Sequence, residues 1–199
     1  MTTNDAFVAW YRTRTSRHRF EALAGAFGRA GVTLVHPGLG TAVLLDVEGD
    51  QVRLPADRVA ELVGFALGPL TVEWWFDADT NVICSFAHEP FGWEKQTYHL
   101  DGLTPQEART VEEVLLGEVR DHPGETVALV VDRTGRTVEF DWDAVVRGDT
   151  AVLGAMPEAL VLDPAAAGAL HGLPSGAVRR ELDPGLVLLT GPDRQPPEG

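Results

Sequence analysis

The amino-acid sequence predicts an α+β fold of mainly antiparallel sheet packed by three or four helices. Two patterns indicate this fold. Several short segments alternate apolar and polar residues and are separated by turn residues, which is typical of hairpin strands. Three longer segments repeat apolar residues three and four positions apart and carry capping or terminating residues at their ends, which is typical of amphipathic helices.

The first hundred residues are expected to form seven strands and two helices. Ser16 is suited to cap the first helix and Gly31 to end it, while Pro55 suits the first turn of the second helix. The last three strands are expected to form a meander, because alternation continues across two turns. The expected segments are strand 7–11, helix 18–31, strands 32–35, 42–47 and 51–54, helix 56–67, and strands 72–77, 82–87 and 93–100.

The second half of the chain begins with the clearest helix signal in the sequence. Thr104, Pro105 and Glu107 stand at the positions of a capping box with proline in the first turn, ahead of an apolar stripe that continues to Val119. Residues 126–142 are then expected to form a hairpin. The remaining expected segments are a helical turn at 143–148, strands 158–162 and 185–189, a short helix at 163–172 and a disordered tail at 191–199.

A weak internal similarity suggests two related units. Residues 46–59 can be aligned with residues 132–145, and Asp, Gly, Val, Asp and Val then coincide. Any two hairpins share glycine in the turn and valine in the strand, so chance also explains this match. The sequence therefore predicts an N-terminal α+β unit at 1–101 and a C-terminal α+β unit at 102–190, and it leaves open whether they pack as one domain.

Composition and charge exclude several classes of function. The formal net charge of −14 disfavours nucleic-acid binding on electrostatic grounds, because affinity for phosphates depends on lysine and arginine. The longest apolar runs are far shorter than the roughly 20 residues that span a bilayer, so no membrane partner is expected. A single cysteine and a start without a signal-peptide pattern favour a cytoplasmic protein. Lys95 is the only lysine among sixteen basic residues.

One short segment resembles part of a calcium loop. Asp77, Asp79 and Asn81 stand at alternate positions, as the first oxygen ligands of such a loop do. However, Val82 occupies the position that requires glycine, and His88 occupies the position that requires glutamate. Residues 77–81 are therefore expected to form a hairpin turn without a metal.

Four residues in the middle of the chain are candidate ligands for zinc or another divalent metal. His88, Glu89, His99 and Asp101 lie within fourteen residues and supply imidazole and carboxylate groups. Their spacing matches no known motif, and backbone hydrogen bonding at a sheet edge explains them equally well. We expect no metal and no cofactor. Cys84 alternates with apolar neighbours and is expected to lie in the core.

The tryptophans of the meander indicate a binding surface. Trp74 and Trp75 are adjacent in a predicted strand and must point to opposite faces of the sheet, so one of them needs a cover or a partner. Aromatic residues surrounded by charged ones resemble the anchors of protein–protein interfaces. The expected partner-binding residues are Trp75, Phe91, Trp93, Glu73 and Asp77.

These observations predict a non-enzymatic, acidic, protein-binding module that neutralises or regulates a protein partner. A basic partner, such as a nuclease toxin, would suit the net charge. In size, charge and class alone, the chain resembles bacterial immunity and inhibitor proteins. Two alternatives remain: a small-ligand or metal-dependent enzyme with a pocket near His88, Glu89 and His99, and a structural subunit of a larger assembly.

Overall fold

The computed structural model describes residues 5–89, 92–182 and 185–191, and it confirms the predicted α+β fold. Ten strands form one sheet in the order β11-β12-β9-β7-β1-β6-β5-β4-β2-β3, in which every neighbouring pair is antiparallel. The separate two-stranded sheet β10-β8 is parallel. The strands of the large sheet are β1 (Phe7–Thr13), β2 (Ala42–Leu45), β3 (Gln51–Leu54), β4 (Leu70–Trp75), β5 (Asn81–His88), β6 (Trp93–His99), β7 (Thr126–Asp132), β9 (Ala159–Leu162), β11 (Val178–Leu182) and β12 (Leu186–Thr190).

Five α-helices accompany the sheet in the described part of the chain. They are α1 (Arg17–Arg29), α2 (Ala56–Phe65), α3 (Pro105–Asp121), α4 (Trp142–Val146) and α5 (Pro164–Ala169). A short 3₁₀ helix covers Pro123–Glu125, and β8 (Ala151–Val152) pairs with β10 (Leu170–His171). None of the helices in the described ranges has the length and apolar character needed to cross a membrane.

Local sequence explains the ends of the long helices. Ser16 caps α1, because its side-chain oxygen accepts a hydrogen bond from the backbone N–H of Arg19 at 3.2 Å. The predicted capping box is present at the start of α3. Glu107 accepts from the backbone N–H of Thr104 at 2.7 Å, and Thr104 accepts from that of Glu107 at 3.3 Å.

Strand β1 lies in the centre of the sheet and is buried on both faces. It pairs with β6 on one side and with β7 on the other, both antiparallel. Val8 and Trp10 point into the larger of two apolar cores, whereas Phe7, Ala9 and Tyr11 point into the smaller one. Because successive side chains of a strand point to opposite faces, β1 contributes residues to both cores.

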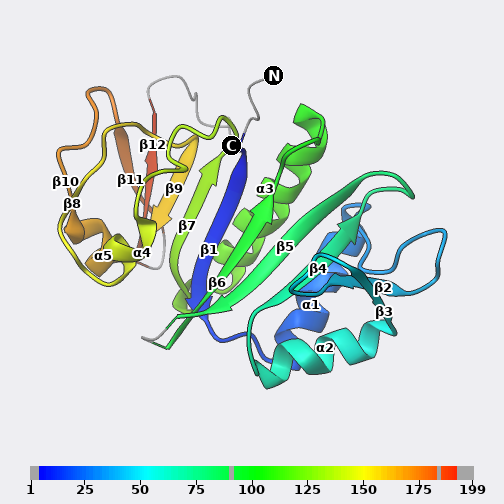
Figure 1. Cartoon of the computed structure of the whole chain (residues 1–199). Helices are drawn as coiled ribbons and strands as arrows, with labels where there is room; N and C mark the ends of the chain where they lie inside the picture. Colours follow the sequence, from blue (N-terminus) through cyan, green and yellow to red (C-terminus); the bar gives the residue numbers. More distant parts are fainter. Residues whose placement is uncertain (1–4, 90–91, 183–184, 192–199) are drawn as a thin grey trace.

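The helices cover opposite faces of different parts of the sheet (Figure 1). We call the face that packs against α1, α2 and α3 the helical face; its core includes Phe20, Leu23 and Leu115. The other face is covered by helices only in the C-terminal half, where Trp142 and Val145 of α4 join the second core. Each face is therefore left partly uncovered: the helical face beyond α3, at β11 and β12, and the other face beyond α4, at β5 and β6.

Two expected strands did not form. Residues 32–35 make only isolated bridges, Thr33 with Trp75 and Val35 with Ala42. Residues 137–140, expected as the second strand of a hairpin, form turns instead. The buried carboxylate of Asp132 explains this second difference, because it accepts hydrogen bonds from the backbone N–H groups of Thr134, Arg136 and Thr137. These bonds curl the chain away from β7, whose two edges are already paired with β1 and β9.

Strands from both halves of the chain belong to the same sheet, since β1 pairs with β6 and with β7. The division into units at 1–101 and 102–190 stays a prediction. In both aligned segments, 46–59 and 132–145, a turn precedes a helix. In the first segment the turn is followed by β3, which pairs with β2, whereas no strand forms at the corresponding residues 137–140 of the second segment. Residues 192–199 of the expected tail lie outside the described ranges.

Candidate functional site

Trp75, the leading expected anchor, is covered by the chain itself. Trp74 points into the core of the helical face and contacts the rings of Phe20 and Phe27. Trp75 points the other way, and only 6% of its surface is exposed. The ring of His36 lies over it, with a centroid distance of 4.2 Å. The loop that contains His36 therefore closes the second face of β4 at this point.

The expected partner-binding residues do not form one cluster around Trp75. Glu73 is buried beside it, and burial raises the pKa of its carboxyl, although a hydrogen bond from Gln51 opposes this shift. Asp77 is exposed in the β4–β5 turn. Trp93 packs against the second core, at the other end of the meander from Trp75. Phe91 lies outside the described residues.

Residues 77–81 form the predicted hairpin turn. The Asp77 carboxylate accepts hydrogen bonds from the backbone N–H groups of Asp79 at 2.8 Å and Thr80 at 2.7 Å. These two bonds lower the pKa of Asp77. The carboxylate therefore stabilises the turn.

The metal-ligand candidates are spread along the β5–β6 hairpin. His88 pairs with Glu94 in the strand register, whereas His99 pairs with Ile83, so the two histidines lie toward opposite ends. Asp101 accepts a hydrogen bond from the backbone N–H of Ala6 at 3.3 Å. Among the described residues, no group of three or more potential ligands is arranged to hold a metal ion. Cys84 is fully buried, as predicted, and burial raises the pKa of its thiol.

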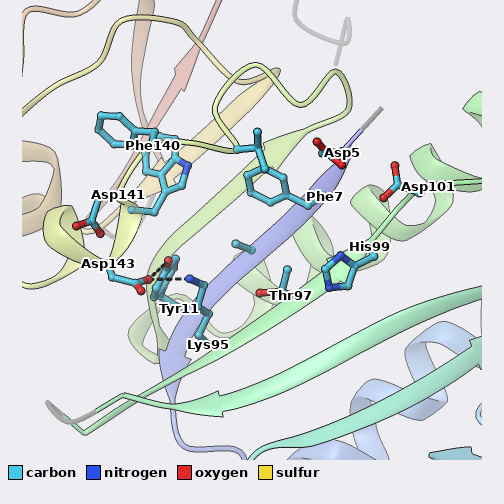
Figure 2. A pocket seen from close by; sticks show the side chains of 13 residues that line it. Asp5, Phe7, Tyr11, Lys95, Thr97, His99, Asp101, Phe140, Asp141 and Asp143 are labelled. Atoms are coloured by element: carbon cyan, nitrogen blue, oxygen red, sulfur yellow. Dashed lines mark hydrogen bonds and ion pairs between the residues drawn. The ribbon is translucent and has the colours of Figure 1, made fainter. Parts of the chain in front are cut away.

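Beside α4, on the face opposite the helical face, lies a groove of about 450 Å³. Its floor is formed by β1 and β6, and its wall by the segment that leads into α4 (Figure 2). Gly135 lets this segment approach β1 closely, because a Cβ at this position would lie 3.2 Å from the carbonyl oxygen of Asp5. We call this site the acidic groove. The residues that line it are Asp5, Phe7, Ala9, Tyr11, Lys95, Thr97, His99, Asp101, Val138, Phe140, Asp141, Trp142 and Asp143.

The carboxylates of the acidic groove lie at its two ends. Figure 2 shows Asp5 and Asp101 at one end and Asp141 and Asp143 at the other, with Phe7 between them. Against these four aspartates stand one lysine, Lys95, and His99. The groove thus combines excess negative charge with aromatic walls.

Asp143 connects the floor of the acidic groove to its wall. It accepts hydrogen bonds from the Tyr11 hydroxyl and from Lys95 Nζ, the latter at 2.8 Å. Burial alone would raise the pKa of Asp143, but the hydrogen bonds from Lys95 and Tyr11 outweigh it and lower the pKa below its ordinary value. Burial, together with the bond to Asp143, raises the pKa of Tyr11, so its hydroxyl stays protonated and donates.

Replacing this carboxylate tests its role. We expect Asp143→Asn to lower the free energy of unfolding by about 1 kcal/mol at pH 7, a modest value because the side chain is 34% exposed and solvent screens its charge. A lowered folded-state pKa stabilises the protein above the unfolded pKa of about 3.9, and this contribution is lost as the pH falls through the folded-state value. The difference between variant and parent should therefore shrink below about pH 4. Urea unfolding at both pH values measures it.

Asp141→Asn is the matched control for this substitution. Asp141 caps α4 by accepting from the backbone N–H of Ala144 at 2.9 Å, and asparagine caps helices equally well. This variant should keep the parental stability. Equal stability of Asp143→Asn and the parent at neutral pH would contradict the role assigned to Asp143.

A second polar cluster lies at the end of β1, on the helical face. The Arg12 side chain is 1% exposed, and its Nη2 pairs with Glu125, which is 32% exposed. Arg12 Nε and Nη1 have no hydrogen-bond partner among the described residues, although the guanidinium carbon lies 4.0 Å from the centroid of the Trp10 ring. Burial lowers the pKa of Arg12, and Glu125 opposes that shift. Glu125 also accepts from Arg19 Nε at 3.1 Å.

Sequence reasoning missed the acidic groove. Its residues come from three segments, 5–11, 95–101 and 138–143, which are brought together by sheet pairing and by the turns after β7. The one local signal was the single lysine, which lies in the groove and makes contacts with Asp143 and with the Tyr11 ring, 5.2 Å from its centroid. Comparison of the chain with protein families, with curated proteins and with solved structures found no match.

Proposed function

We propose that this protein is a non-enzymatic binding module that receives a basic segment of a protein partner in the acidic groove. The observation that supports this proposal is the pairing of carboxylates at both ends of the groove with aromatic residues between them. An extended segment that carries lysine or arginine would place its cations near the carboxylates and its aliphatic stems on the aromatic walls. The role would be that of an inhibitor or immunity protein.

The charges of the acidic groove favour a basic partner. The Lys95 ammonium is already paired with Asp143, so it does not neutralise Asp5 or Asp101 at the other end. The whole chain carries −14, so the local field and the overall field attract the same kind of partner. Such complementarity accelerates association and selects against acidic proteins.

Phe140 is the partly exposed aromatic residue of the acidic groove and suits cation binding, whereas Phe7, Tyr11 and Trp142 are buried. Lys95 Nζ already lies 5.2 Å from the centroid of the Tyr11 ring, which shows that a cation and an aromatic ring meet here. Phe140 lies at the wall and stacks edge-on against Trp142, with a centroid distance of 4.6 Å. Cations over aromatic faces contribute about 0.5–2 kcal/mol each, depending on their exposure.

The experiment compares two variants with equal charge. In the groove variant, Asp5→Asn, Asp101→Asn and Asp141→Asn remove three carboxylates but keep their hydrogen-bonding capacity. In the control, Asp50→Asn, Asp57→Asn and Asp79→Asn make the same change in net charge on exposed positions elsewhere. Tagged versions of each are used to capture proteins from cells that encode the chain, and captured candidates are then purified and titrated by calorimetry at two salt concentrations.

A basic partner should bind the parent and the control equally and the groove variant at least about tenfold more weakly, a change of about 1.4 kcal/mol. Its affinity should also fall with salt. Binding that is equal in all three proteins, or a partner with no basic segment, would overturn the proposal. A toxicity-rescue assay with the purified partner then tests the inhibitor role.

The structural-subunit alternative depended on an exposed apolar face at 104–119. In the structure, Ala108, Val111, Leu115 and Val119 of α3 are buried in the core of the same chain. The enzyme alternative depended on a pocket near His88, Glu89 and His99. Only His99 of these lines the acidic groove. Neither alternative is favoured by a specific observation.

A further inference from the structure

The helical face has a second groove, beyond α3, with a volume of about 390 Å³. We call it the apolar groove. One turn of α3 forms its wall, and β9, β12 and β11 form its floor. Seven of its ten lining residues are apolar: Leu116, Val119, Ala159, Val161, Val178, Leu182 and Leu188. The other three are Arg120, Arg180 and Thr190.

This groove exists because the layer of helices ends at α3. The core of the helical face includes Ala159, Val161 and Leu186, so the floor is continuous with packed core. Farther out, alternation along the edge strand β11 directs Val178, Arg180 and Leu182 into the groove. Val178 is 55% exposed. The groove is therefore an extension of the apolar core that the described residues leave open to solvent.

Two guanidinium groups border this apolar floor. Arg120 lies on α3 and Arg180 on β11, and neither takes part in an ion pair among the described residues. Arg120 Nε donates only to the carbonyl oxygen of Leu116, at 3.3 Å. In a chain with a net charge of −14, two arginines that have no ion-pair partner among the described residues, beside an apolar groove, form a local site for an anion.

We propose that the apolar groove binds an amphiphilic carboxylate, a fatty-acid-like molecule with its aliphatic chain on the floor and its head group at Arg120 and Arg180. Guanidinium groups bind carboxylates through paired, charge-assisted hydrogen bonds. An aliphatic chain gains from each methylene that it removes from water. Apolar clefts of roughly 300–1,000 Å³ with a few placed polar groups are typical small-molecule sites, and this groove falls in that range.

Other occupants fit the groove less well. A whole helix is about 10–12 Å wide, so only a few of its side chains would enter a space of this volume. The residues at the C-terminal end, 191–199, contain glycine, proline and polar residues but no large aliphatic or aromatic side chain. A second copy of the chain would bring arginines against arginines if the same groove met itself.

The experiment uses dodecanoate, 1-dodecanol and dodecyltrimethylammonium, each below its micelle concentration, titrated into the purified full-length chain. The readouts are calorimetry and displacement of a fluorescent naphthalene sulfonate dye. We expect dodecanoate to bind one molecule per chain, at least about tenfold more tightly than the alcohol, which has the same tail without the charge. The cation should bind least.

Three variants locate the site. Arg120→Gln and Arg180→Gln should each reduce the preference for dodecanoate over dodecanol, while Val178→Asp should weaken the binding of both. Val178 is exposed, so this variant is expected to fold, which circular dichroism and the urea midpoint check. The groove variant with Asp5→Asn, Asp101→Asn and Asp141→Asn should bind dodecanoate as the parent does. A failure of this proposal can therefore be told apart from a failure of the proposed partner role.

Several results would overturn this inference. They are the absence of saturable dodecanoate binding, equal affinity for dodecanoate and dodecanol, and binding unaffected by Val178→Asp. Light scattering that shows a dimer abolished by Val178→Asp would assign the groove to a second copy instead. Saturable binding of an acidic amphipathic peptide, with none of dodecanoate, would assign it to a protein.

Discussion

Replacing Trp74 by alanine is expected to lower the free energy of unfolding by about 3–5 kcal/mol, the range measured for the loss of a large buried aromatic side chain. Trp74 is fully buried on the helical face, where its ring contacts Phe20 and Phe27, with a centroid distance of 4.8 Å to Phe27. Alanine would leave a cavity enclosed by β4 and α1, and close-packed neighbours relax only partly into such a space. Urea unfolding followed by circular dichroism measures the loss.

Trp75→Ala is the control on the same strand. Its ring faces the opposite side of the sheet, and its cover is a single loop that contains His36. A loop collapses toward a cavity more readily than a helix fixed in the core, so the loss of stability should be smaller than for Trp74→Ala. If Trp75→Ala lowered the free energy of unfolding more than Trp74→Ala does, the packing of Trp75 under the His36 loop would contribute more to stability than the packing of Trp74 in the core, and this prediction would be wrong.

Glu125→Ala is expected to destabilise the protein by about 3 kcal/mol, because it leaves the buried Arg12 guanidinium without its charge partner. This value is at the low end of the range for buried pairs, since Glu125 itself is partly exposed. Arg12→Met should cost less than about 1 kcal/mol. Methionine fills the volume over the Trp10 ring, removes two unpaired buried donors and leaves Glu125 paired with Arg19.

The order of these two effects is the informative result. Urea midpoints of both single variants and of the double variant form a double-mutant cycle. In the Arg12→Met background, Glu125→Ala should cost clearly less than in the parent, because no buried charge is then left behind. Equal losses for both single variants, with no coupling between them, would show that the Arg12–Glu125 pair does not behave as a buried ion pair.

Local signals predicted most helices and strands, because caps, alternation and turn residues act over a few positions. The capping box at Thr104 and the meander from Leu70 to His99 are examples. Residues 137–140 were predicted incorrectly, since valine and phenylalanine favour a strand, yet the buried carboxylate of Asp132 holds the backbone in turns. A side chain five positions away decided the structure there.

The candidate site was beyond the reach of local patterns. Lys95 and Asp143 meet because β6 pairs with β1, and because the chain after β7 turns back over both strands. No spacing in the sequence connects them. Trp75 was chosen as an anchor because one face of its strand needed a cover, and the sequence could not show that His36 provides it.

The central position of β1 has a consequence for how the chain reaches its native state. Strand β1 precedes β6 and β7 in the chain and must wait for both, and Phe7 is finally paired with His99 and Asp132. Pairings between residues so distant in sequence make folding slow, because long loops must close before any contact compensates the lost entropy. Until α3 and β7 have been synthesised, one edge of this apolar strand has no partner. Folding of the N-terminal half thus depends on β7, which is synthesised more than a hundred residues after β1, and the nascent chain would benefit from protection during that interval.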